Sequence, residues 1–341
     1  MKILVTGGCG FIGSHTVVAL VEEGFEPILV DDFSNSERFI LQRLEKITKR
    51  KLKLYEGDCC DIDFMEKIFS ENRDMQGIIH FAAYKSVPES VANPLKYYVS
   101  NLTSLCNILK VSHQFSVTNL IFSSSCTVYG IPDQLPVTEE TPTKPANSPY
   151  GNTKKICEDI LKDFVAVNDL KTYILRYFNP IGAHPSGEIG ELPIGVPGNL
   201  VPFITQTAIG KRDKLVIFGK DYATKDGTNI RDFIDVCDLA LAHVKAVKHL
   251  ISIQSPKHLD VFNIGTGNGC SVLEAVEAFE KANQLKLNYV FGERRAGDVE
   301  AIFANVEKAE KTLNWKSTTT LEKSMENAWR WEKHLKELEL N

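Results

Sequence analysis

The chain has 341 residues, of which 43% are hydrophobic and 24% are charged, with a formal net charge of −5 at pH 7. This length predicts a large core with a second region, and the acidic balance argues against nucleic acid or an anionic membrane as the main partner. No apolar run approaches the ~20 residues of a transmembrane helix, and the strand-like start leaves no room for a signal peptide.

A buried strand is predicted over 3–5, because a continuous apolar run is typical of a parallel sheet. Gly7, Gly10 and Gly13 follow with the spacing G-x-x-G-x-x-G, and a helix is predicted over about 11–23. Glycines at this spacing allow a tight turn and let backbone N–H groups approach a pyrophosphate at the helix N-terminus. The segment therefore predicts a dinucleotide site rather than a plain strand-to-helix turn.

A second strand, predicted over 27–30, ends beside two carboxylates, Asp31 and Asp32. A carboxylate at this point accepts hydrogen bonds from ribose hydroxyls and repels a 2′-phosphate. The sequence therefore favours NAD over NADP.

A helix over about 36–50 and a strand over 52–55 come next. Asp58 follows that strand and either faces the adenine or belongs to a helix N-cap region. A fourth strand is predicted over 77–81, in which His80 is interpreted as a satisfied core residue rather than a ligand.

The segment after the fourth strand begins with two small residues, Ala82 and Ala83, which let the backbone lie close to a cofactor. Lys85 follows, and it is either a phosphate or cofactor contact or a solvated loop lysine.

The residues that indicate chemistry begin with three serines at 123–125, which end an apolar run. A helix is predicted over 149–167 with Ser148 as its N-cap. Tyr150 and Lys154 lie four apart and therefore share one face of that helix. The reference pKa of a tyrosine is about 10, and an ammonium one turn away favours the phenolate, so the pair is suited to take a proton from a substrate hydroxyl.

The helix over 149–167 has a long partner over 94–115, and the two either form a four-helix dimer interface or simply pack on their own sheet. A further strand is predicted over 172–175. The alternation of strands and helices through residue 180 predicts an α/β fold with a doubly wound parallel sheet.

The composition of the chain changes after residue 180, because the segment 181–200 is rich in glycine and proline. Helices over 200–209 and 238–250 and strands near 215–218 and 261 follow. Arg294, Arg295 and Asp298 lie in a predicted loop, where arginines suit a diphosphate by bidentate contact or are ordinary surface charges.

Eight scattered cysteines lack C-x-x-C spacing, and no histidines have zinc spacing. We therefore expect reduced thiols in a cytoplasmic protein and no metal site.

The chain resembles the extended short-chain dehydrogenase/reductase family over nearly its whole length, and within that family it is similar to the enzymes that epimerise UDP-sugars at C4. The segments that carry the resemblance are LVTGGCGFIGSH, HFAAYKSVPESV, FSSSCTVYG, SPYGNTK, LRYFNPIGAHPSG and RRAGDV. The resemblance implies a Rossmann domain over 1–180, with segments near 230–265 returning to it, and a smaller α/β domain for the UDP-sugar, mainly over 181–341. It also implies NAD-dependent interconversion of UDP-galactose and UDP-glucose in galactose metabolism, through a 4-keto sugar, by a homodimer.

The family pattern further implies roles for individual residues. The catalytic residues are Ser125, Tyr150 and Lys154, with Lys154 lowering the pKa of Tyr150 and holding the nicotinamide ribose. The remaining cofactor contacts are Gly7, Gly10, Phe11, Ile12, Gly13, Asp31, Asp32, Phe33, Ser34, Asn35, Ser36, Asp58, Cys59, Phe81, Ala82, Ala83, Lys85, Asn101 and Phe178. The substrate contacts are Lys85, Ser125, Thr127, Tyr150, Asn179, Asn199, Leu200, Phe218, Arg231, Arg295 and Asp298.

The sequence departs from the family pattern at several positions. An asparagine that contacts the cofactor in bacterial relatives falls on Ser100, next to Asn101, and Cys126 replaces a common alanine. Ile302 stands where some bacterial relatives have a large aromatic residue. Since that side chain limits the room near the sugar C2 substituent, we expect Ile302 to admit N-acetylhexosamines.

Alternative functions differ in specific residues. A nucleotide-sugar 4,6-dehydratase of the family needs an acidic pair just after the strand serine, where this chain has Cys126 and Thr127. A UDP-glucuronate decarboxylase or epimerase differs in residues that recognise a carboxylate. A non-catalytic NAD(H) sensor has no need of the three catalytic residues, and an ordinary dehydrogenase would release stoichiometric NADH.

Overall fold

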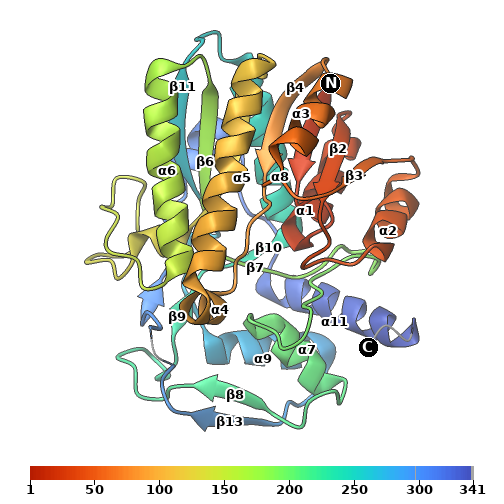
Figure 1. Ribbon diagram of the computed structural model, residues 1–341. Helices are drawn as coiled ribbons and strands as arrows, with labels where there is room; N and C mark the ends of the chain where they lie inside the picture. The colour runs from red at the N-terminus through yellow and green to blue at the C-terminus, as the bar shows by residue number, and fades with distance from the viewer. Residues whose placement is uncertain (296, 339–341) are drawn as a thin grey trace.

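A parallel sheet of seven strands forms the centre of the computed structural model, which describes residues 1–295 and 297–338. Its spatial order is β11-β6-β5-β4-β1-β2-β3, so the direction of winding reverses between β1 and β4 (Figure 1). Ligands of open α/β sheets bind at such a reversal, beyond the carboxyl ends of the strands. The strands are β1 (Lys2–Thr6), β2 (Glu26–Asp31), β3 (Lys53–Glu56), β4 (Met75–His80), β5 (Asn119–Ser125), β6 (Lys171–Tyr177) and β11 (His258–Ile264).

Helices cover both faces of this sheet and make two separate cores. Ile3 and Val5 of β1 face the core built with α1, α2 and α8, whereas Leu4 faces the core built with α3, α5 and α6. Successive side chains of a strand point to opposite faces, so a strand buried on both sides is apolar throughout. The predicted doubly wound α/β fold is confirmed. The helices are α1 (Phe11–Glu22), α2 (Phe39–Thr48), α3 (Ile62–Glu71), α4 (Val87–Ala92), α5 (Pro94–Gln114), α6 (Pro149–Val167), α8 (Val236–Ser252) and α10 (Glu307–Leu313).

A smaller region with its own core lies below the sheet in Figure 1. Three helices, α7 (Leu200–Ala208), α9 (Val272–Asn283) and α11 (Leu321–Glu337), pack there beside short strands. Those strands form three small sheets: β7 (Asn179–Ile181) with β10 (Phe233–Asp235); β8 (Leu215–Phe218) with β13 (Tyr289–Gly292); and β9 (Ile230–Arg231) between β12 (Cys270–Ser271) and β14 (Ala301–Ile302).

Four helices, α3, α4, α9 and α10, were not anticipated, although the sequence carries a start signal for α3 and α9. Asp61 caps α3 by accepting a hydrogen bond from the N–H of Phe64. Ser271 and Glu274 form a capping box at the start of α9. Within the described part of the chain, no helix has both the length and the apolar character needed to span a membrane.

Candidate active site

The glycine turn joins β1 to α1 at the point where the sheet reverses. The N–H of Gly7 donates to the carbonyl O of Val30 over 2.7 Å, and Gly7 has a φ of +68°. A Cβ on Gly13 would lie 2.0 Å from the carbonyl O of Gly7, so only glycine lets the helix approach the turn this closely. Gly10, the N-cap of α1, offers no side-chain acceptor to the first helical N–H groups. This open N-terminus suits a pyrophosphate.

Asp31 connects the end of β2 to this turn. One of its carboxylate oxygens accepts from the N–H of Cys9 over 2.8 Å, and the other from Phe33 N (3.0 Å) and Ser36 Oγ (2.6 Å). Burial raises the pKa of Asp31, and these three hydrogen bonds counter the rise. The predicted ribose segment is therefore tied to the glycine turn as one unit.

The other residues of the predicted ribose and adenine segments lie nearby. Asp32 accepts from Ser34 N (2.9 Å), and Asn35 is exposed in the same turn. The N–H of Gly57 donates to the carbonyl O of Asp31, which brings the following Asp58 and the buried Cys59 alongside.

The end of β4 closes against the glycine turn from the other side. The carbonyl O of Thr6 accepts from the N–H of Phe81, and its hydroxyl contacts His80 Nδ1 at 2.8 Å. A Cβ on Gly7 would lie 3.0 Å from Ala82 N, so Ala82 and the adjoining Ala83 run directly beside the turn. His80 is 2% exposed and hydrogen bonded, which confirms it as a satisfied core residue.

The predicted catalytic helix begins as the sequence indicates. Ser148 caps α6 by accepting from the N–H of Gly151 over 3.1 Å, and Pro149 is the first helical residue. Tyr150 is partly exposed, whereas Lys154, one turn later, is buried. Ser125 is the last residue of β5 and lies beside the Tyr150 phenol. The structure therefore brings the three predicted catalytic residues together.

Lys154 is anchored to the serine-rich end of β5. Its ammonium donates to the carbonyl O of Ser123 over 2.7 Å and lies 4.9 Å from the centre of the Phe122 ring. The Ser123 hydroxyl is hydrogen bonded to the Tyr177 phenol. Tyr177, which sequence reasoning gave no role, lies close enough to Tyr150 for the Tyr150 phenol to add to the rise in the pKa of Tyr177 that burial causes.

The pKa of Tyr150 is shifted in the opposite direction to the one predicted. Burial raises it to about 12, and the neighbouring Ser125 hydroxyl only partly offsets the rise. Burial also lowers the pKa of Lys154 to about 8, against the attraction of the Cys157 and Glu158 side chains. The expectation that Lys154 alone stabilises the phenolate fails because the ammonium is held by a backbone carbonyl and the phenol is removed from water.

Arg295 and Arg231 meet around Asp298, whereas Arg294, the other arginine predicted to suit a diphosphate, pairs with Asp221. The Asp298 carboxylate pairs with Arg295 at 2.8 Å and with Arg231 at 3.7 Å. The Arg295 guanidinium lies 5.9 Å from the ring centre of Phe218, which is 43% exposed. Ile302 pairs in register with Arg231 across β14 and β9. Two arginines beside an exposed aromatic ring suit a nucleoside diphosphate.

A second cluster joins the cofactor side to the substrate side. Glu191, which the sequence analysis missed, accepts from the Asn199 side-chain amide over 2.5 Å and pairs with Lys85 at 3.5 Å. Leu200 is the first residue of α7, directly after Asn199, and the N–H of Asn179 donates to the carbonyl O of Asp232. The only sequence signal for Glu191 was its place in the glycine-rich loop.

A small apolar cluster forms one wall next to Ser125. It contains the buried side chains of Cys126, Phe178 and Ile302. Thr127 follows in the 3₁₀ turn η1 (Cys126–Tyr129), and its buried hydroxyl has no hydrogen-bond partner among the described residues. A buried hydroxyl of this kind fits a polar group of a ligand.

Asn101 has a structural position that its predicted cofactor role did not include. Its amide donates to Tyr84 O and Thr153 Oγ1 and accepts from Tyr84 N, all within 3.1 Å. The side chain thereby fixes the segment that precedes Lys85 against α6, and its contact with a cofactor stays a prediction.

Comparisons with known proteins agree on one family. A family model described as GDP-mannose 4,6 dehydratase matches residues 4–328. A UDP-glucose 4-epimerase of Bacillus subtilis (strain 168) is 46% identical over 97% of each chain.

Solved structures give the same result. A UDP-glucose 4-epimerase from Bifidobacterium longum, in complex with NAD⁺ and UDP, is 44% identical over 98% of each chain with a TM-score of 0.94. The UDP-Glc/GlcNAc 4-epimerase from Campylobacter jejuni is 36% identical, covers 98% of this chain and 99% of its own, and has a TM-score of 0.83.

Proposed function

Because this chain belongs to the UDP-glucose 4-epimerase family of extended short-chain dehydrogenases/reductases, we propose that it interconverts UDP-galactose and UDP-glucose with NAD as cofactor. The observation that carries the proposal is the convergence of Ser125, Tyr150 and Lys154 at the carboxyl end of β5, on the same edge of the parallel sheet as the glycine turn. The alternative of a 4,6-dehydratase is disfavoured because the positions after Ser125 hold a buried thiol and a threonine, neither of which is an acid suited to eliminate water.

The chain's residues fit the cofactor. The crowded approach of Gly13 to Gly7 leaves no room for a side chain in the turn, and the uncapped start of α1 offers N–H donors to a pyrophosphate. Asp31 would hold the ribose, together with the cofactor contacts named above. NAD⁺, when bound, would accept the hydride from C4 of the sugar and give it back after the sugar has turned, and its positive charge would favour the phenolate form of a neighbouring tyrosine.

The chain's own residues handle the proton and the sugar. Tyr150 takes the proton of the sugar 4-OH while Ser125 hydrogen bonds the same oxygen, and Lys154 keeps a positive charge one turn away. The 4-keto sugar turns about its link to the diphosphate and presents its other face, and Tyr150 then returns the proton to the oxygen. Arg231, Arg295 and the residues around them would hold the UDP group throughout, because binding energy from a remote handle retains the intermediate.

The test is incubation of the purified protein with UDP-galactose and catalytic NAD⁺. UDP-glucose should appear without net NADH. Stoichiometric NADH absorbance would indicate an ordinary dehydrogenase, and absence of any product with cofactor still bound would move the substrate to another nucleotide sugar.

We also propose that the enzyme accepts UDP-GlcNAc and UDP-GalNAc, as a UDP-Glc/GlcNAc epimerase of the same fold does. Ile302 belongs to the apolar cluster beside Ser125, where an aromatic side chain would fill the space proposed for the sugar C2 substituent. We expect Ile302→Tyr to lower N-acetyl turnover relative to UDP-galactose on the order of 10–100-fold, because steric discrimination in a pocket has this size. Parallel kcat/KM measurements check this, with Ile302→Leu as the volume-conserving control. An unchanged ratio in the tyrosine variant would contradict the assignment.

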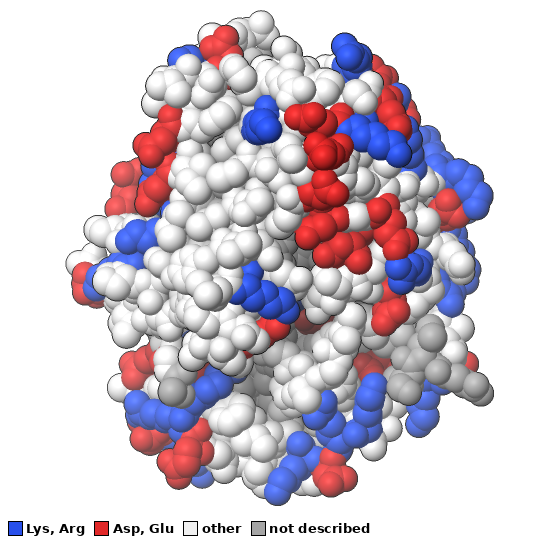
Figure 2. All heavy atoms as spheres, viewed as in Figure 1, with Lys and Arg blue, Asp and Glu red and all other residues white. Residues whose placement is uncertain are grey.

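We propose a homodimer through α5 and α6, with α4 extending the same face. Val87 and Val91 lie four residues apart on α4, and Leu95 and Val99 four residues apart on α5; they are 42%, 63%, 74% and 63% exposed. Figure 2 shows that the face carrying α5 and α6 has few charged side chains. An apolar stripe of this kind is typical of an interface.

Leu95→Glu should convert the dimer to a monomer in light scattering, since a charge buried in an apolar interface is costly. Val290→Glu, on the exposed strand β13, should leave the mass unchanged. A monomeric wild-type protein would refute the dimer.

We further propose a cytoplasmic location and a division into domains near residue 180. All eight cysteines are free, as in a reducing compartment, and cell fractionation tests the location. The separate core formed around α7, α9 and α11 supports the division, although β11 returns to the central sheet. Limited proteolysis near residue 180 tests it.

A further inference from the structure

A buried ion pair that the proposed mechanism does not use joins α6 to the sheet. Arg176 and Glu158 are 4% and 1% exposed. The guanidinium donates twice to the carboxylate, Nε to Oε1 over 2.9 Å and Nη2 to Oε2 over 2.5 Å. Ser124 donates its hydroxyl to the same Oε1 over 2.6 Å. These three hydrogen bonds fix the orientation of the Glu158 carboxylate.

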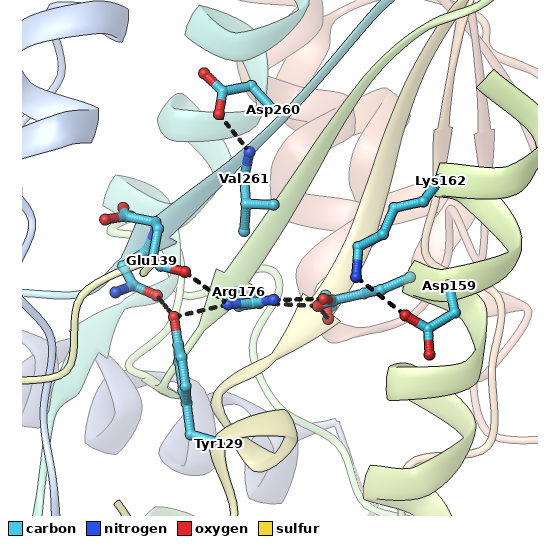
Figure 3. Close-up of polar contacts among 10 residues, drawn as sticks. Tyr129, Glu139, Asp159, Lys162, Arg176, Asp260 and Val261 are labelled. Atoms are coloured by element: carbon cyan, nitrogen blue, oxygen red, sulfur yellow. Dashed lines mark hydrogen bonds and ion pairs between the residues drawn. The ribbon is translucent and has the colours of Figure 1, made fainter. Parts of the chain in front are cut away.

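Arg176 also contacts the turn that follows β5 (Figure 3). Its Nη1 donates to the Tyr129 hydroxyl over 3.1 Å, and the guanidinium lies 4.9 Å from the centre of that ring. The Tyr129 hydroxyl donates to Asn263 Oδ1 on β11 over 2.7 Å. The backbone N–H of Asn263 donates to the Glu139 carboxylate over 2.7 Å. The network thus spans three strands and two loops.

The members of this network are next to the proposed catalytic residues in the chain. Ser124 directly precedes Ser125, Tyr129 closes the turn η1 that begins after it, and Glu158 lies one helical turn beyond Lys154. We infer that Glu158 and Arg176 are positioning residues. They fix α6, which carries the base Tyr150, relative to the end of β5, which carries the Ser125 hydroxyl. This inference rests on the proposed epimerase function.

Stability alone does not account for such a pair. Removing two charges from water is costly, and apolar residues of similar volume often replace a buried ion pair with no loss of stability. A bidentate guanidinium–carboxylate pair does add fixed geometry. Positioning of catalytic groups has a steep dependence on distance, since a shift of about 1 Å can cost on the order of 10²-fold in rate.

Glu158 also acts on the charge of Lys154. Its carboxylate raises the pKa of Lys154 against the lowering by burial. The other groups that face the ammonium are the His80 ring, the Ser123 carbonyl, the Phe122 ring and the Cys157 thiol. The pKa of His80 is lowered to about 3 by burial and by Lys154. None of these carries a second negative charge at neutral pH. Glu158 is therefore the negatively charged group whose removal should lower the pKa of Lys154.

The test is Glu158→Gln, which keeps the shape and removes the charge. We expect kcat for UDP-galactose to fall on the order of 10–100-fold with KM nearly unchanged, and the alkaline limb of the kcat–pH profile to move down by about one unit. Asp159→Asn is the matched control, because Asp159 is the next residue of α6 but its side chain is 59% exposed and pairs with Lys162 at the surface. It should change neither kcat nor the limb.

A second variant separates positioning from folding. Glu158→Leu combined with Arg176→Met should fold, as thermal unfolding will report, and still lose kcat. The inference would be overturned if Glu158→Gln kept the wild-type kcat and the alkaline limb of its pH profile did not move. It would also be overturned if both variants failed to fold, because the role of the pair would then be structural. Wild-type protein assayed alongside distinguishes these results from an error in the proposed function, because an inactive wild type would refute that function itself.

Discussion

Replacing Tyr150 by phenylalanine is expected to lower kcat for UDP-galactose by about 10²–10⁴-fold, the usual contribution of a positioned general base. The change removes one hydroxyl and keeps the ring. The fold should be unaffected, because only one hydroxyl is lost and its neighbour Ser125 keeps a second partner in the N–H of Thr127. Loss of activity with unchanged thermal unfolding and unchanged bound NAD would assign the base.

The matched control is Tyr55→Phe. The Tyr55 hydroxyl donates to Glu71 at the end of α3. Tyr55 lies on the edge strand β3, with β4, β1 and β2 between it and β5. This variant should keep wild-type kcat. Near-wild-type activity in Tyr150→Phe would instead show that another group takes the proton.

The dependence of activity on pH in the wild-type enzyme also tests Tyr150 as the base. Tyr150 acts only when it is deprotonated, and its pKa is raised, so activity should increase with pH from the acid side. Lys154 is charged only below its pKa of about 8, so once the positive charge of bound NAD⁺ brings the pKa of Tyr150 below that value, activity should fall as pH rises through it. Tyr150→Phe should remove the acid limb, as measured by initial rates of UDP-glucose formation.

The central sheet could be predicted from sequence because its strands are buried on both faces. The run Ile3–Val5 contributes to both cores, so no polar residue interrupts it. The short strands of the second region gave weaker signals: β9, β12 and β14 have two residues each and are held by partners distant in sequence. Their pairing depends on tertiary contacts, which local patterns do not contain.

The candidate site was predictable where residues act through the backbone or through helical spacing. Ser148, Tyr150 and Lys154 are fixed by one helix, and the structure places them as expected. The pKa of Tyr150 was not predictable, because burial depends on what packs around the phenol. Glu158, Arg176 and Glu191 were missed for a related reason, since their partners lie on other elements and no spacing within the sequence links them.

Gly13→Ala is the second large effect that the structure predicts. The added Cβ would lie 2.0 Å from the carbonyl O and 2.9 Å from the carbonyl C of Gly7, and 3.1 Å from the Cα of Gly8. All three atoms are backbone, so no side chain can rotate away and the turn itself must move. The same turn carries the N–H groups proposed for the pyrophosphate. Binding of NAD should weaken on the order of 10²-fold, or about 2.7 kcal/mol, and epimerisation should fall with it.

Gly198→Ala controls for the general effect of adding a methyl group, because a Cβ there meets nothing within 4 Å and the residue has no positive φ. Calorimetric titration of the cofactor-free proteins with NAD⁺ measures both variants. If Gly13→Ala unfolds at nearly the wild-type temperature but no longer binds NAD⁺, the damage is confined to the turn. Retained affinity would mean that the turn can shift without losing the cofactor, and the pyrophosphate would then have to be held elsewhere than at the start of α1.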